Sequence, residues 1–223
     1  MGTVEGGFFK RIKKDFEYRA YVTSIVSFCA SLAFAGYNIF LGAAYETVWN
    51  ISVAVYYLLL VGVRAFVGIK EIKFKKSELT DEEKEERRKN VFLVQSVMLF
   101  VVDLALIGPI TIMALQRKSV DYSTIPAIAV AAYTVFKIVT SSISYAKTRK
   151  MTNLGVRSFK NLNFIDALVS VLTLQYTLIM TFGDGITGEM LTLCAVTSFA
   201  IWVFLIAVSV TNLIQSIKIK RAV

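Results

Sequence analysis

The feature that most constrains this chain is a series of long apolar runs. Stretches of about 20 apolar residues, each able to cross a hydrocarbon core of about 30 Å as a helix, recur along its whole length. The runs are continuous, whereas a membrane barrel needs segments of roughly ten residues with alternating polarity. The chain is 56% hydrophobic, against about 45–50% in soluble domains. The sequence therefore predicts an all-α, polytopic integral membrane protein.

We predict one transmembrane domain over residues 1–223 with six spans. The predicted spans lie near 21–43, 48–69, 91–115, 123–146, 162–182 and 190–215. Of the 25 Lys and Arg residues, 21 fall in the N-terminal segment, 70–90, 147–160 and the C-terminal segment. Because positive residues concentrate on the cytoplasmic side, we expect both termini in the cytoplasm and a multi-pass protein of the cell membrane. This distribution also explains the net charge of +9 without a nucleic-acid partner.

Short connections on the outer side predict that consecutive spans pair into three helical hairpins. Residues 50–70 also align with 127–147 at several positions, which suggests a parallel repeat of hairpins as a hypothesis. The charged segment 70–90 is the one sizeable polar insert. In it, Thr80 and Glu83 have the spacing of a capping box, which predicts a cytoplasmic helix running directly into the third span. A docking surface for a partner is the alternative interpretation of this segment.

The residues offer no known catalytic or metal-binding pattern. Histidine is absent, and no HExxH or G-x-S-x-G motif occurs. We expect no cofactor, no metal and no enzymatic activity. Cys29 and Cys194 lie in apolar spans at different predicted depths, so we expect no disulfide between them.

Four ionisable residues lie within the predicted spans, and helix rise of about 1.5 Å per residue gives their depths. Arg64 and Asp166 are each six residues from a flanking lysine, roughly 9 Å inside the cytoplasmic boundary. Asp103 and Lys137 are ten or more residues inside, near the midplane. Equal depth, and the expected contact between spans three and four, predict an Asp103–Lys137 pair. A second pair, Arg64–Asp166, is weaker because Arg64 can also extend to the headgroups.

The Asp103–Lys137 pair has two interpretations. It is either a packing lock between helices or part of a polar site reached by water. Candidates for a substrate or ion path are Asp103, Lys137, Arg64, Asp166, Gln175 and Gln95. Gln95 and Gln175, like Asn38, Thr173 and Asn212, are also typical of hydrogen bonds between helices.

Several stretches resemble a family of small, uncharacterised six-span integral membrane proteins of Gram-positive, largely anaerobic bacteria. They are FEYRAYVTS (16–24), ETVW (46–49), AVYYLLLVGVR (54–64), YAKTRK (145–150) and DALVSVLTLQYTLIM (166–180). The resemblance covers most of the chain and implies the same six-span topology, but no activity, cofactor or ligand. At the position of Gln175 this family often has an acidic residue, and the amide here argues against proton transfer at that place.

Six spans with little mass outside the bilayer favour a small-solute or ion transporter or channel, with a polar path near Asp103 and Lys137. The first alternative is a non-transporting interaction or structural membrane protein that uses 70–90 and the small residues Ser27, Ser31 and Ala35. An intramembrane enzyme is the second alternative. The partners expected are the lipid bilayer and an unidentified small solute or ion, and a homo-oligomer is compatible with the sequence.

Overall fold

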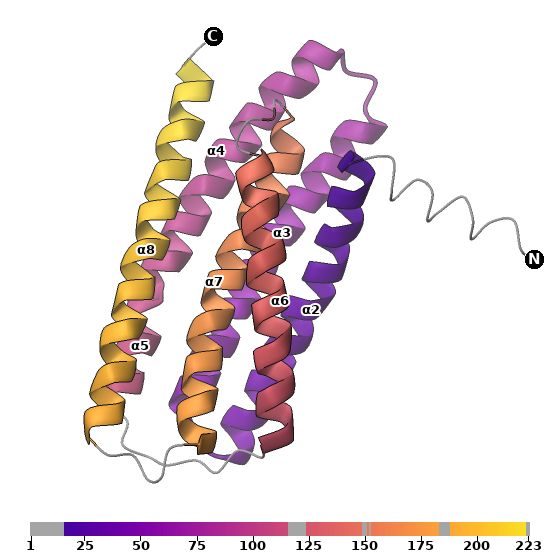
Figure 1. The fold of residues 1–223 in the computed structure, drawn as a ribbon. Coiled ribbons are helices and arrows are strands. Elements are labelled where there is room, and N and C mark those ends of the chain that lie inside the picture. Colours follow the sequence, from indigo (N-terminus) through magenta and orange to yellow (C-terminus); the bar gives the residue numbers. More distant parts are fainter. Residues whose placement is uncertain (1–15, 116–123, 149–150, 152, 183–187, 222–223) are drawn as a thin grey trace, which may run out of the picture.

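A computed structural model of the protein describes residues 16–115, 124–148, 151, 153–182 and 188–221. These residues form helices and contain no strand (Figure 1). The helices are α2 (Phe16–Ala44), α3 (Val48–Lys76), α4 (Asp81–Ala105), α5 (Ile107–Leu115), α6 (Thr124–Thr148), α7 (Leu154–Phe182) and α8 (Gly188–Arg221). The predicted all-α class is therefore confirmed.

Among the residues that the structure describes, five helical segments are long and apolar enough to cross a membrane. They are Val22–Ala44, Val48–Lys76, Asp81–Ile112, Leu154–Ile179 and Thr192–Arg221. Helix α6 lies outside this set, so six spans, like the cytoplasmic location of the termini, stay a prediction. Large apolar side chains also face outward, for example Phe136 at 67% and Phe40 at 66% exposure. Exposed apolar surface of this extent fits a protein surrounded by lipid.

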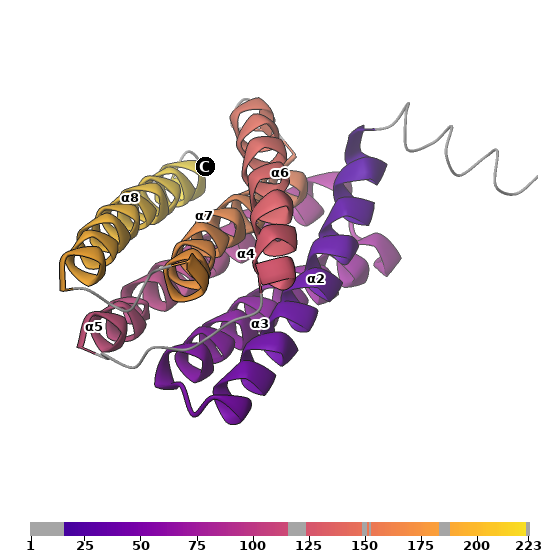
Figure 2. The same ribbon diagram turned by 60° about the horizontal axis from the view of Figure 1, so that its bottom comes forward.

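Helix α7 is the centre of the bundle (Figure 2). It packs against α2, α3, α4, α6 and α8, and every residue from Leu154 to Ser170 is buried. The start of α2, the α3–α4 connection and the end of α8 lie at one end of the bundle (Figure 1). We refer to this end as the cytoplasmic end, following the charge distribution.

The expected contact between spans three and four is wrong. In the described part of the chain, α6 packs on α7 and contacts neither α4 nor α5, which pack on α3, α7 and α8. Helices α2 and α3 do form a packed antiparallel hairpin. The central position of α7 separates α6 from α4, a result that short connecting segments alone do not predict.

Two helices extend well beyond their predicted spans at the cytoplasmic end. Helix α3 ends at Lys76 instead of residue 69, and α7 begins at Leu154 instead of residue 162. The polar start of α7 is packed inside the bundle, where Gln95 Nε2 donates a hydrogen bond of 2.9 Å to the Ser158 carbonyl. Hydropathy locates the apolar stretch, whereas the helix continues as far as its backbone and polar side chains find partners.

The capping box predicted at Thr80 is confirmed. The Thr80 side chain accepts from the Glu83 backbone, and the Glu83 carboxylate accepts from the Thr80 backbone N–H at 2.9 Å. Arg88 then donates two hydrogen bonds, of 3.2 and 3.1 Å, to the buried carboxylate of Glu71. The insert is therefore a tight connection anchored to α3, and α4 continues from it into the bundle as predicted.

Candidate functional site

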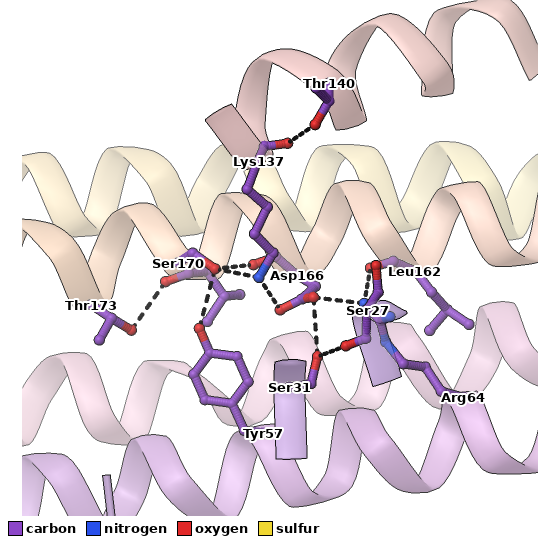
Figure 3. A network of polar contacts seen from close by, with 11 residues as sticks. Ser27, Ser31, Tyr57, Arg64, Lys137, Thr140, Leu162, Asp166, Ser170 and Thr173 are labelled. Atoms are coloured by element: carbon purple, nitrogen blue, oxygen red, sulfur yellow. Dashed lines mark hydrogen bonds and ion pairs between the residues drawn. The ribbon is translucent and has the colours of Figure 1, made fainter. Parts of the chain in front are cut away.

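A buried carboxylate on α7 holds two cations from different helices. Asp166 Oδ2 accepts from Arg64 Nη2 of α3 at 2.7 Å, and Oδ1 accepts from Lys137 Nζ of α6 at 2.8 Å (Figure 3). The side-chain exposures are 0% for Asp166, 1% for Arg64 and 9% for Lys137. The predicted Arg64–Asp166 pair is confirmed, and Lys137 joins it. We call these three residues the charged centre.

Hydroxyl groups complete the coordination of the charged centre. Lys137 Nζ also donates to Ser170 Oγ at 2.7 Å, and Ser31 Oγ of α2 lies 3.1 Å from Asp166 Oδ2. Ser170 donates its single proton to the Asp166 carbonyl at 2.7 Å. The Tyr57 hydroxyl, 3.3 Å from Ser170 Oγ, is therefore the donor in that contact. Four helices thus meet at Asp166 (Figure 3).

The three charges meet because they lie at equal depth in their helices. Arg64 is twelve residues before the end of α3, and Asp166 is twelve residues after the start of α7. Lys137 is eleven residues before the end of α6. Each is therefore roughly 16–18 Å from the cytoplasmic end of its helix. The predicted depth of Asp166, about 9 Å, was counted from Lys160, whereas α7 continues six residues further, to Leu154.

The charged centre has one more cation than anion among its three members. Lys137 Nζ lies 5.7 Å and 5.8 Å from the ring centroids of Phe34 and Tyr133, so the faces of two aromatic rings also surround the ammonium. A buried ion pair that is neutral overall is a common packing device, whereas a net charge inside a membrane is costly. This excess of positive charge gives the centre a chemical preference for an anion.

Asp103 lies apart from the charged centre, so the predicted Asp103–Lys137 pair is wrong. Its carboxylate, 0% exposed, accepts from the Tyr56 hydroxyl at 3.0 Å and from the Ser209 hydroxyl of α8. Two facts explain the error: α4 does not touch α6, and Asp166 lies as deep as Lys137. Hydroxyl groups therefore surround Asp103, and Lys137 pairs with the carboxylate of Asp166 instead.

A break in the helix lies beside Asp103. Helix α4 ends at Ala105 and α5 begins at Ile107, two residues before Pro109, which has no N–H to donate. The Asp103 carbonyl accepts from Trp202 Nε1 at 2.9 Å. At this break the Asp103 carbonyl also accepts from the Leu106 N–H at 3.3 Å, so both the backbone and a side chain of α8 bind it.

Two neighbouring tyrosines join the two sites. Tyr56 bonds to Asp103 and Tyr57 to Ser170, and their rings meet edge-to-face with centroids 6.1 Å apart. Both rings are buried. The residues 56–57 therefore form the boundary between Asp103 and the charged centre.

The two glutamines lie outside both sites. Gln95 bonds to α7 as described above, and Gln175 Nε2 donates to the Cys194 carbonyl of α8 at 3.3 Å and to Thr197. Each joins two helices, as expected for an amide inside a bundle. These contacts do not support a position of Gln95 or Gln175 on a substrate path.

Sequence reasoning did not find the hydroxyl partners of the two carboxylates. They are Tyr56, Tyr57, Ser170 and Ser209, with Ser31 noted only for its small size. One signal was available, because Ser170 is four residues after Asp166 and so lies on the same helix face. No comparable spacing points from Asp103 to Ser209, which is 106 residues away.

The described residues contain no group of three His, Cys, Asp or Glu side chains placed to hold a metal. Comparison of the chain with protein-family models, curated proteins and solved structures finds no match. Cys29 is exposed and Cys194 buried, and both are free thiols. Function is therefore argued from the geometry of the charged centre.

Proposed function

We propose that this protein is a small transporter of anionic solutes, and that the charged centre binds the transported anion. The observation that supports this proposal is the composition of the centre, where two buried cations face one buried carboxylate. An anion entering the centre compensates the excess charge, which a packing lock does not require. The helices also fit a membrane protein by length and composition.

The contacts of the centre come from helices that enclose the substrate position between them. Ser31, Arg64, Lys137 and Asp166 belong to α2, α3, α6 and α7 in turn. Binding sites of transporters commonly lie near the membrane midplane, between helices that move relative to one another. Lys137 is the member best placed to exchange partners, because its long side chain reaches across from α6 (Figure 3).

Transport is tested with purified protein in liposomes, by recording charge movement on a supported membrane after jumps of chloride, nitrate, acetate or octanoate. We expect anion-dependent current in the wild type that falls at least tenfold in Lys137→Met. Asp103→Asn tests the path predicted from sequence, and Lys73→Met at the exposed end of α3 is the matched control. Absence of anion current in folded wild type, or equal current in Lys137→Met, contradicts the proposal and leaves a packing lock.

The alternative of a non-transporting interaction protein loses one of its two surfaces. Ser31 and Ala35, assigned to partner binding, are 0% and 1% exposed inside the bundle. The alternative then depends on residues 77–88, whose charged side chains are mostly exposed. Deleting 77–88 and finding that a co-purifying protein is lost, while anion current persists, supports a docking role in addition to transport.

A further inference from the structure

A pocket beside the charged centre is lined by one of its members, Arg64. The pocket, of about 340 Å³, lies between α2 and α3 at the cytoplasmic end, with α7 behind it. Its walls include Ile25, Phe28, Ala65, Gly68, Ile69 and Phe159. Arg64 also lines it, and so do Glu71 and Lys75, which lie about two and three helical turns nearer the cytoplasm. We call this hollow the α2–α3 groove.

The groove exists because small residues of α3 face α2. A Cβ added at Gly68 meets no atom within 4 Å, so the space beside it is open. Arg64 and Lys75 are eleven residues apart on α3, which makes the groove about 16 Å long. The cavity volume is near the lower limit of ligand pockets, roughly 300–1,000 Å³. The groove therefore suits one slender molecule and is too small for a two-chain phospholipid.

Arg64 has donors to spare at the inner end of this groove. Its Nη2 binds Asp166 at 2.7 Å and lies 3.5 Å from the Leu162 carbonyl. Its Nε and Nη1 have no hydrogen-bond partner among the described residues, although the side chain is 1% exposed. Buried donors without acceptors are costly, and a guanidinium N–H donates strong, charge-assisted hydrogen bonds to a carboxylate. Both facts point to an acceptor that arrives with a ligand.

We propose that the α2–α3 groove binds an aliphatic monocarboxylate, with its carboxylate on Arg64 and its chain along Ile69 and Phe28. Apolar walls select the chain, and the excess cation of the charged centre selects a single negative charge. This inference names the substrate class of the proposed transporter and rests on that proposal for transport, but not for binding.

Binding is tested by photolabelling of the full chain in zwitterionic nanodiscs at pH 8.5, with an octanoate analogue bearing a diazirine on its chain. Peptide mapping should place the label on α2 and α3 within the groove. Octanoate should compete, whereas octylamine, with the same chain and opposite charge, and acetate, with the same charge and no chain, should not. This pattern requires both the chain and the carboxylate.

Two glycine variants separate the groove from the general lipid surface. Gly68→Leu fills the hollow and should lower labelling about tenfold, equivalent to about 1.4 kcal/mol of binding. Gly62→Leu is the matched control on α3, because Gly62 is exposed outside the groove and an added Cβ there also meets nothing within 4 Å. Neither substitution clashes at its first atom, so both variants should fold.

Five results overturn the inference: absent labelling, label spread evenly over exposed helices, equal loss in both glycine variants, competition by octylamine, or displacement by phosphatidylglycerol but not octanoate. The last result would assign the groove to a membrane lipid. Specific labelling without anion current would leave the binding site in place and reject transport. Anion current that Gly68→Leu leaves unchanged, together with absent labelling, would reject the groove and keep the proposed function.

Discussion

Neutralising Asp166 should be far more damaging than neutralising Lys137, although the two residues form one ion pair. At an effective dielectric constant of about 20, each cation at 2.7 or 2.8 Å attracts Asp166 by about 6 kcal/mol. Desolvation of the buried ions offsets most of this gross energy. The net outcome of a substitution therefore depends on which charges it leaves without a partner.

Asp166→Asn leaves two buried cations beside a neutral amide, and we expect the protein to lose about 3–5 kcal/mol of stability. Lys137→Met leaves the Arg64–Asp166 pair, which is neutral, and keeps an unbranched side chain along Phe34. We expect a change of about 1 kcal/mol or less, because the desolvation cost of the ammonium also disappears. The double variant leaves one unpaired cation, so it should be more stable than Asp166→Asn alone by at least about 1 kcal/mol.

The measurement is equilibrium unfolding in mixed micelles, followed by tryptophan fluorescence, for the wild type, both single variants and the double variant. Lys73→Met, at an exposed position of α3, is the control and should change stability by less than about 0.5 kcal/mol. If Lys137→Met is as damaging as Asp166→Asn, or if the double variant is the least stable of all, the excess of positive charge in the centre is refuted.

Three further predictions follow from other contacts. Tyr56→Phe removes the 3.0 Å hydrogen bond to Asp103 and should cost about 1–3 kcal/mol in the same unfolding assay, whereas an unchanged midpoint would mean that Ser209 alone suffices. Leu162→Ala, at a side chain of α7 that is 0% exposed, should cost about 2–5 kcal/mol, while Leu58→Ala on the exposed face of α3 should cost much less. The hydrogen bonds from Thr80 hold the pKa of Glu83 below its ordinary value of 4.5, so its carboxylate stabilises the start of α4 at neutral pH. That contribution is lost as the pH falls through the lowered pKa, and hydrogen exchange of the amides of residues 83–84, corrected for its intrinsic pH dependence, should then accelerate in the wild type but not in Glu83→Gln.

The sequence predicted the positions of the helices better than it predicted which helices pack against one another. Helix positions, the Thr80 capping box and the Arg64–Asp166 pair could be found from hydropathy, spacing and charge. The partner of Lys137 could not, because it depends on where α7 starts and on which helix occupies the centre. The polar run 154–161 lies outside the predicted span, yet it forms the buried start of α7. Contacts between distant segments, such as Asp103 with Ser209, have no local signal at all.

The arrangement of charges links the two buried sites. The four ionisable residues predicted inside the spans sum to zero, but the structure divides them unequally between the sites. The charged centre holds two cations and one anion, and Asp103 is surrounded by the hydroxyls of Tyr56 and Ser209.

A monoanion bound at Arg64 makes the charged centre neutral and removes the attraction between it and Asp103 across the Tyr56–Tyr57 boundary. A proton taken up by Asp103 is then the charge that balances the molecule, because its partners are hydroxyls that accept as readily as they donate. Anion binding and protonation of Asp103 should therefore favour each other, and an Asp103→Asn variant, neutral at every pH, should bind anions with less dependence on pH than the wild type.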